Sequence, residues 1–357
     1  MKRRHSCAGC LVRLMFALLF AAAIAAGVVY YSVSRPYQGF QNPIILDFPK
    51  GTSTQDMAAQ LEQAGVIRYS WQFLVVRAMR PNARLLAGEY QFSQPASVAT
   101  VFEHIERGDV FFYELTVPEG SNMFDIASSI DRFNFMKGAD FMRVARDPAP
   151  IRDLAPDAPT LEGYLFTSTY RIERSTTAKQ LGHMMTDLFR KHWRELQTSD
   201  HPEAVNAVVT LASLVEKETA VPDERPLVAA VYTNRLRLGM PLDCDPTTIY
   251  AALTEGRYRG TIHRSDLDNP NPYNTYRRAG LPPGPIANPG LAALKAALAP
   301  AESPYLYFVA KPDGSGSHQF SENIDQHNRA VEQYRRRNKP APDIKPTAPA
   351  AHRKRQK

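Results

Sequence analysis

The stretch that decides the fold reads AVNAVVTLASLVEKET, residues 204–219. At about 100° per residue its apolar side chains gather on one face, which predicts an amphipathic helix. Two carboxylates, Glu216 and Glu218, stand at the end of this apolar pattern. Burying a carboxylate costs free energy unless the group is paired or protonated. A carboxylic acid kept protonated in a cleft is a general acid, so this helix end is the strongest indication of function.

The helical periodicity separates the two acids. Glu218 falls about 60° from the middle of the apolar face and Glu216 about 100° from it. We therefore expect Glu218 to be the more buried acid with the higher pKa, and Glu216 to lie at the border, where it tunes or orients Glu218. The alternative is a frayed helix end in which both acids pair with Lys217 or Arg225.

An apolar segment near the start predicts a membrane anchor. Residues 14–33 carry no charge, and about 20 residues are enough to cross a bilayer as a helix. Basic side chains precede the segment at Lys2, Arg3, Arg4 and Arg13. They predict that residues 1–13 stay in the cytoplasm and that residues 35 onward are exported. A cleaved signal peptide is the alternative, with Ala25-Ala26-Gly27 as a weak cleavage site, but we favour an uncleaved single-pass anchor.

The net charge of +7 comes from the two ends of the chain. Residues 1–13 and 335–357 are strongly basic, whereas the body between them is slightly acidic. A nucleic-acid-binding protein would carry its excess positive charge on a folded face, so no nucleic-acid partner is expected. Cys7 and Cys10 form a C-x-x-C pair in a segment too short for a redox fold, and no residue cluster has metal-ligand spacing. We expect neither a metal nor a cofactor.

Two similar segments follow the anchor. Pro49-Lys50-Gly51-Thr52 and Pro118-Glu119-Gly120-Ser121 each read as a strand end, a tight turn, a polar cap and a short helix. They predict two related βα units within one small α+β domain, residues 34–132. Between them, 89–92 alternates like a strand, and 97–108 reads as a helix ended by Gly108.

Residues 133–338 are predicted to form a second, mixed α/β domain. Its expected elements are two helices between 202 and 239 broken at 221–224, a rigid Pro/Gly loop at 282–290, a helix at 291–299, strands at 305–309 and 318–320, and a helix at 322–338. The Pro/Ala/Lys tail, 339–357, is expected to be disordered.

Several long motifs in fixed order resemble one family. The sequences ASLVEKET (212–219), ERP (224–226), NRL (234–236), DPT (245–247) and YNTY (273–276) resemble the core signature of the MltG (YceG-like) endolytic murein transglycosylases. The resemblance continues through GLPPGPI (280–286), NPG (288–290), PYLYFV (304–309) and HQF (318–320). The second βα unit also resembles a LysM module, a small fold that binds the N-acetylglucosamine chains of peptidoglycan or chitin.

The family resemblance implies an activity. It implies lytic cleavage between N-acetylmuramic acid and N-acetylglucosamine in nascent glycan strands, which leaves a 1,6-anhydro end without using water. It implies that Glu218 is the catalytic residue, first as acid and then as base. It further implies a bacterial inner-membrane protein with a periplasmic catalytic domain, peptidoglycan strands as substrate and wall synthases as partners.

Other residues are expected to line the cleft on the strength of the same motifs. They are Glu162, Glu216, Asp245, Thr247, Asn274, Tyr276, Pro285 and His318. Two positions depart from the family pattern: Thr167-Ser168 stands where Pro-Asp is usual, and Cys244 stands where a small hydroxyl residue is commoner.

The sequence therefore predicts an α+β protein with one transmembrane helix, a small LysM-like α+β domain and a mixed α/β catalytic domain with a helix-borne glutamate. Two alternative functions remain. One is a peptidoglycan-binding scaffold of the wall-synthesis machinery without cleavage activity. The other is an ordinary hydrolase that uses Glu218 together with Asp245 or Glu216.

Overall fold

The structure is a computed structural model that describes residues 7–196 and 202–337. The chain divides into two compact units. The first unit comprises Met1–Leu115, Asn134–Met136 and Thr169–Thr177, and the second comprises Thr116–Phe133, Lys137–Ser168 and Ala178–Lys357. The predicted tail 339–357 and the first six residues of the predicted N-terminal segment 1–13 lie outside the described residues.

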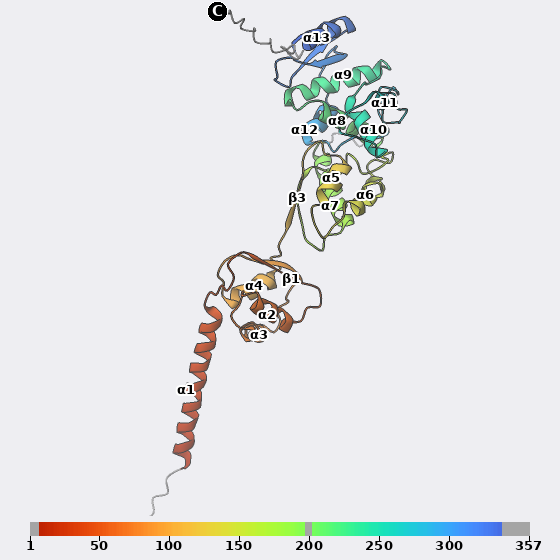
Figure 1. Ribbon diagram of the computed structural model, residues 1–357. Coiled ribbons are helices and arrows are strands. Elements are labelled where there is room, and N and C mark those ends of the chain that lie inside the picture. The colour runs from red at the N-terminus through yellow and green to blue at the C-terminus, as the bar shows by residue number, and fades with distance from the viewer. Residues whose placement is uncertain (1–6, 197–201, 338–357) are drawn as a thin grey trace, which may run out of the picture. The chain divides into compact units, whose positions relative to one another are not determined.

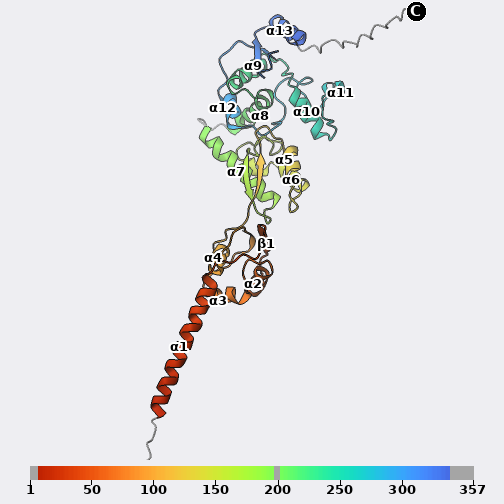
Figure 2. The same cartoon turned by 60° about the vertical axis from the view of Figure 1, so that its left-hand side comes forward.

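The first unit holds the apolar helix and a small α+β core. In chain order its elements are α1 (Cys7–Ser34), β1 (Ile44–Phe48), α2 (Thr54–Gln63), α3 (Ser70–Met79), β2 (Gly88–Phe92) and α4 (Val98–Arg107). The stretch Leu11–Ser34 of α1 is long and apolar enough to span a membrane, and it includes the predicted span 14–33. Figures 1 and 2 show α1 ending against α3 and α4.

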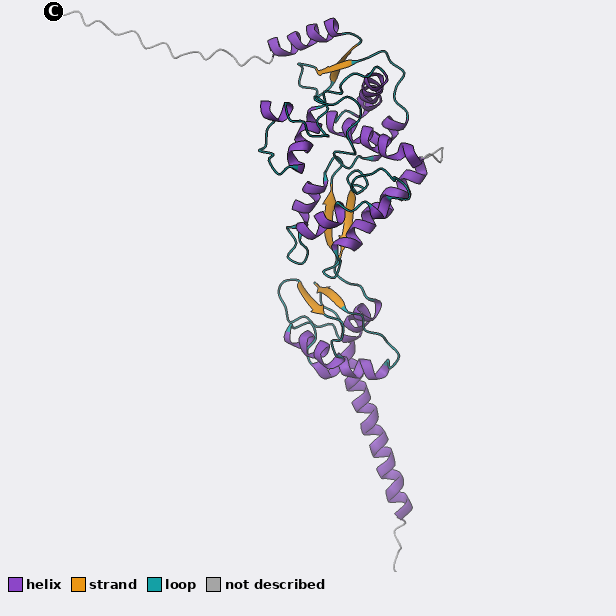
Figure 3. Cartoon of the chain, turned by 90° about the vertical axis from the view of Figure 1, so that its right-hand side faces the viewer, coloured by secondary structure: helices purple, strands orange, loops and turns teal. Residues whose placement is uncertain are grey.

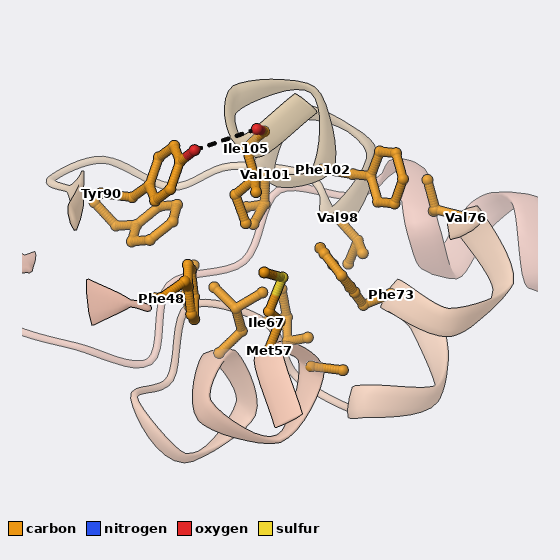
Figure 4. Close-up of a cluster of buried hydrophobic side chains, with 14 of the residues drawn as sticks. Phe48, Met57, Ile67, Phe73, Val76, Tyr90, Val98, Val101, Phe102 and Ile105 are labelled. Atoms are coloured by element: carbon orange, nitrogen blue, oxygen red, sulfur yellow. Dashed lines mark hydrogen bonds between the residues drawn. The ribbon is translucent and has the colours of Figure 1, made fainter. Parts of the chain in front are cut away.

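The core of the first unit lies between a two-stranded sheet and three short helices. β1 and β2 pair antiparallel, with Ile44 opposite Phe92 and Phe48 opposite Gly88. Figure 4 shows Phe48, Phe73 and Phe102 pointing into one cluster. The strand predicted at 89–92 and the helix predicted at 97–108 are confirmed as β2 and α4. Ser97 caps α4 by accepting a hydrogen bond from the Thr100 N–H, and Gly108 ends it with a φ of 70°.

A second pair of strands, β3 (Tyr113–Val117) and β4 (Ser168–Ile172), is separate from β1 and β2, as Figure 3 shows. The division between the units passes through both of these strands. The two similar βα segments therefore do not share one sheet, and the second segment continues into the second unit. The chain divides at a different place from the boundary predicted at residue 132, because helix α5 (Met123–Ile130) packs against α6 (Gly138–Ala145).

The second unit is mainly helical. After α5 and α6 its elements are η1 (Ala149–Ile151), α7 (Ala178–Leu196), α8 (Pro202–Glu218), η2 (Pro222–Glu224), α9 (Arg225–Arg237), α10 (Asp245–Thr254), α11 (Arg264–Leu267), α12 (Leu291–Leu298), β5 (Tyr307–Ala310), β6 (His318–Ser321) and α13 (Ile324–Arg337). The two predicted helices with a break at 221–224 are confirmed as α8 and α9. The helix predicted at 291–299 and the strands predicted at 305–309 and 318–320 are confirmed as α12, β5 and β6.

Helix α8 is central in the second unit, where α9, α10 and α12 all pack against it. The loop before α12 is tied to α8 by Ser213, whose Oγ accepts a hydrogen bond from the Ile286 N–H at 3.1 Å. Strands β5 and β6 pair antiparallel, with Tyr307 opposite Ser321, and α13 packs against them. These contacts fix the position of the C-terminal end of α8, which carries Glu216 and Glu218.

The same region is held by a close approach of the Gly163 backbone to the side chains of Pro285 and Val209. Gly163 has a φ of 88°, and its N–H donates to Asn288 Oδ1 at 2.8 Å. A Cβ on residue 163 would lie 2.5 Å from Pro285 Cβ and 2.9 Å from Val209 Cγ1. Only glycine fits this left-handed position between α8 and the loop before α12.

We expect Gly163→Ala to lower the free energy of unfolding by about 3 kcal/mol, because it adds both backbone strain and overpacking. Gly256→Ala is the matched control. Gly256 has a φ of 67° but open space around the new Cβ, so it should cost only about 1 kcal/mol of backbone strain. Denaturant unfolding monitored by circular dichroism measures both. Equal losses in the two variants would contradict the close packing at Gly163.

Candidate active site

Glu218 is the last residue of α8, and its carboxyl group meets the next helix. Tyr232, on α9, donates a hydrogen bond from its hydroxyl to Glu218 Oε1 at 2.9 Å. The Cys244 thiol donates a second hydrogen bond to the Glu218 carboxyl group. Tyr232 and Cys244 are each only 1% exposed, so both partners are fixed within the protein. Two buried hydrogen-bond donors, Tyr232 and Cys244, thus fix the Glu218 carboxyl group.

On its other side Glu218 opens into a cavity of about 330 Å³. The side chains that line this pocket with Glu218 are Arg235, Leu242, Asp243, Asp245, Tyr276, Tyr307, Phe308, Ile324 and His327. The Tyr276 hydroxyl donates to Asp245 Oδ1 at 2.6 Å, which fixes the tyrosine ring at the pocket wall. The pocket therefore combines carboxylates with aromatic rings, a combination that suits a polar ligand with apolar ring faces.

The surroundings raise the pKa of Glu218. Burial is the largest cause, and the negative charge of Asp245 acts in the same direction. The hydrogen bonds from Cys244 and Tyr232 and the proximity of His318 oppose the rise, because they stabilise the carboxylate. A carboxylate at the C-terminal end of a helix also meets the negative end of the helix dipole. The group is accordingly poised to hold a proton above the usual range of a glutamate and to release it in the pocket.

The turn before α10 sets the position of Cys244 and the acids of the pocket. The Arg235 guanidinium donates to the carbonyl oxygens of Pro241 and Leu242 and to Asp243 Oδ2, at 3.0–3.1 Å. Asp243 has a φ of 50°, a left-handed conformation that aspartate tolerates. This buried arginine holds the turn in which Cys244 occupies the N-cap position of α10 and interacts with Glu218 through its thiol.

Glu216 has a different role from Glu218. Its side chain is only 6% exposed, and it accepts hydrogen bonds from Arg225 at 3.2 Å and from the Gly290 N–H at 3.0 Å. Burial raises its pKa, although the Gly290 N–H and the charge of Arg225 oppose this. Glu216 was expected at the border of the apolar face, and its pairing with Arg225 agrees with the ion pair that the sequence left open as an alternative. Arg225 and the start of α12 enclose the side chain. It braces α8 against α12 and does not line the pocket.

Glu162 lies wholly inside the protein and outside the pocket lining. Its carboxylate accepts from the Met123 N–H, the Tyr250 hydroxyl and Asn288 Nδ2, at 2.9–3.1 Å. Burial raises its pKa to about 8. This arrangement does not fit the predicted contact with substrate. The side chain instead joins α5, α10 and the loop before α12, and Asn288 extends the connection to the Gly163 and Leu165 N–H groups.

Three further predicted residues, Thr247, Asn274 and Pro285, do not line the pocket. Thr247 is fully buried and bonds to the Cys244 carbonyl at 2.6 Å and to the Thr275 hydroxyl. Asn274 is also fully buried, and its amide donates to three backbone carbonyls of the segment 266–269. Pro285 is buried against Gly163. These three side chains hold parts of the fold together, whereas Asp245 and Tyr276 line the pocket.

His318 does not line the pocket. Its Nδ1 lies 2.7 Å from Glu224 Oε2, and its N–H donates to Glu224 Oε1 at 2.8 Å. Glu224 also lies 3.5 Å from the Thr219 hydroxyl, next to Glu218 in the chain. His318 therefore ties β6 to the break between α8 and α9.

The sequence alone assigns no role to Tyr232 or Arg235. Both lie in buried or nearly buried positions of α9, and the NRL motif around Arg235 was the only signal close to them. Within residues 7–196 and 202–337, no group of three or more His, Cys, Asp or Glu side chains is arranged to hold a metal ion.

A carboxylic acid of raised pKa in a pocket with further acids and aromatic rings has the features of a general-acid site. The chain belongs to the YceG-like family, whose model matches residues 46–333.

Similar proteins carry an activity in their names. The chain is 30% identical over 310 residues to a protein named endolytic murein transglycosylase from Bacillus subtilis (strain 168), covering 81% of this chain and 84% of that protein. It is 28% identical over 321 residues to a protein of the same name from Streptococcus pneumoniae serotype 2, covering 82% of this chain and 58% of that protein. A crystal structure of a yceG-like protein from Listeria monocytogenes matches with a TM-score of 0.52 and 30% identity, over 81% of this chain and 99% of that one.

The hydrogen bond from Tyr232 to Glu218 leads to a prediction of how activity depends on pH. The acid form of Glu218 is lost as the pH rises through its pKa, so activity should fall on the alkaline side. Tyr232→Phe removes a donor that stabilises the carboxylate, so the pKa of Glu218 should rise and the alkaline limb should move to higher pH. We also expect kcat to fall about tenfold, because the carboxyl group loses its orientation. A pH–rate profile on purified sacculi measures both effects.

Tyr250→Phe is the matched control, because it removes another buried tyrosine hydroxyl that bonds to a buried glutamate, Glu162. It should lower stability and leave the alkaline limb where it is. An unchanged limb in Tyr232→Phe, or the same displacement in both variants, would contradict the assigned role of Tyr232.

Proposed function

We propose that this chain is a membrane-anchored endolytic murein transglycosylase. It cleaves the β-1,4 bond between N-acetylmuramic acid and N-acetylglucosamine in nascent glycan strands and leaves 1,6-anhydro ends. One observation carries the proposal: Glu218, a carboxyl group of raised pKa, opens into a pocket with Asp245 and Tyr276. The family and the names of the relatives support the same substrate and reaction class.

In the first step Glu218 acts as general acid. Its proton passes to the glycosidic oxygen as the bond from that oxygen to the anomeric carbon breaks. Positive charge develops on the sugar ring, and the carboxylates of Asp243 and Asp245, which line the pocket, stabilise that charge. The Tyr232 and Cys244 donors stabilise the Glu218 carboxylate that remains.

In the second step the same carboxylate acts as general base. The 6-hydroxyl oxygen of the muramic acid attacks the anomeric carbon, and its proton passes to Glu218. One C–O bond has broken and one has formed within the sugar, the leaving strand carries the first proton, and Glu218 is again protonated. No water is consumed. An intramolecular nucleophile held close to the reacting carbon needs no second catalytic carboxylate.

The walls of the pocket bind the sugar. Tyr276, held by Asp245, offers a ring face for stacking, and Tyr307 and Phe308 supply further apolar surface. The LysM-like segment 118–130 contacts the same strand. Its turn is joined to the active-site helix, since Lys217 Nζ donates to the Gly120 carbonyl at 3.2 Å.

We further place the chain in the bacterial inner membrane. The basic residues before α1 keep the N-terminus in the cytoplasm, and the second unit, with Glu218, works in the periplasm. Wall synthases at the same membrane are the proposed partners, because nascent strands emerge there.

The test is product analysis with Glu218→Gln. The full chain in detergent is incubated with purified sacculi, and the soluble products are identified by mass spectrometry. Wild type should release strands with 1,6-anhydro ends, and Glu218→Gln should lower the rate by at least about 10²-fold. Asp223→Asn, which removes an exposed carboxylate in η2, is the control and should keep full activity.

Each other outcome has a defined meaning. Reducing ends of muramic acid from wild type would identify a hydrolase, with Asp245 as the second carboxylate within the pocket. Binding of the wild type to sacculi without soluble products would identify a scaffold. Anhydro products from Glu218→Gln at the wild-type rate would remove Glu218 from the mechanism.

A further inference from the structure

A second pocket lies where α1 meets the rest of the first unit. It has a volume of about 240 Å³ and is lined by the end of α1, the residues just after it, and the start of α3. Two arginines, Arg35 and Arg68, line it together with Tyr31, Tyr37 and Tyr69. We call this the anchor pocket. It lies entirely within the first unit and has no part in the chemistry of Glu218.

The anchor pocket is built on a fixed frame. Val33, near the end of α1, is only 6% exposed and belongs to the core of the first unit. Gln72, a buried residue of α3, donates from Nε2 to the carbonyl oxygen of Ser32 at 3.1 Å and also bonds to the Ser32 hydroxyl. The end of the apolar helix is therefore packed into the folded unit.

Both arginines of the anchor pocket have free hydrogen-bonding capacity. The Arg35 guanidinium lies over the Tyr31 ring at 5.0 Å, and that of Arg68 lies over the Tyr37 ring at 5.1 Å. Within the described residues, neither guanidinium pairs with a carboxylate or donates to another side chain, and the lining contains no acid. Two planar groups with five N–H donors each thus face one pocket, which suits binding of a phosphate oxygen pair.

The depth of the pocket in a bilayer follows from the length of α1. The uncharged stretch runs from Leu14 to Ser34, and at about 1.5 Å per residue it is about 30 Å long, the thickness of the hydrocarbon core. Arg35, the next residue, therefore reaches the layer of headgroup phosphates. Exposed aromatic side chains stand at the same end, with Tyr31 59%, Tyr69 48% and Trp71 42% exposed. Tyrosine and tryptophan are enriched at this interface.

We propose that the anchor pocket binds the phosphate of a membrane phospholipid, with Arg35 and Arg68 as its ligands. A lipid that projects from the bilayer beside α1 brings its phosphate to the height of the two arginines, whereas a soluble anion would have to reach a site shielded by the membrane surface. The bound lipid clamps the first unit onto the membrane. This inference rests on the anchor and not on the proposed transglycosylase activity.

The experiment is native mass spectrometry of the full chain released from detergent micelles. Dioleoyl phosphatidylglycerol is titrated against wild type, Arg35→Gln/Arg68→Gln and Arg84→Gln/Arg132→Gln. The last variant removes the same charge from exposed arginines outside the pocket lining. Wild type and this control should hold one lipid per chain, and the pocket variant should bind it about 30-fold more weakly. Dioleoylglycerol, which lacks the phosphate, should not form the adduct.

Three results would overturn the proposal. They are equal lipid binding by the pocket variant, equal loss of binding in both double variants, and an equal adduct with dioleoylglycerol. Displacement of the lipid by millimolar inorganic phosphate would instead identify a soluble-anion site and also contradict the proposal. Melting temperatures within about 2 °C of wild type show that the variants are folded. Activity on sacculi is measured separately, so a failure of one proposal can be told from a failure of the other.

Discussion

The candidate active site depends on one constraint: a carboxyl group stands at the C-terminal end of a helix, partly removed from water. Both burial and the helix dipole disfavour the ionised form of Glu218 there, and Asp245 disfavours it further. The hydroxyl of Tyr232 and the thiol of Cys244 limit that penalty without supplying a counter-charge. A salt bridge in their place would have lowered the pKa and removed the acid. Neutral donors leave the proton available, which is the property that a group acting as acid and then as base requires.

Much of the second unit serves to keep that helix end in place. Glu216 joins α8 to Arg225 and to the first turn of α12, and Ser213 joins it to the loop before α12. Glu162 and Asn288 connect that loop to α5 and α10 through buried hydrogen bonds. Several residues in the shared motifs are thus structural. A residue's place in a family motif does not tell whether the residue supports the fold or lines the pocket, because the same geometry needs residues of both kinds.

The sequence predicted a helix or strand well where all the residues that determine it lie in one short segment. The caps at Ser97 and Gly108 defined α4, and the apolar periodicity with its break at 221–224 defined α8 and α9. The inward direction of Glu218 also followed from periodicity alone. The enclosure of Glu216 did not, because Arg225 and the Gly290 N–H come from other segments. Tyr232, Arg235 and the burial of Glu162 likewise depend on contacts between elements far apart in the chain, and so does the separate pairing of β3 with β4.

The most direct test of the account is the pKa of the Glu218 carboxyl group in the folded chain. Carbon-13 labelled glutamate, with the Glu218→Gln spectrum subtracted, isolates its carboxyl resonance in an NMR titration. We predict that this carboxyl group titrates above the ordinary glutamate value of 4.5. Titration at or below 4.5 would contradict it, because Glu218 would then be a carboxylate stabilised by its neighbours and could not serve as the acid.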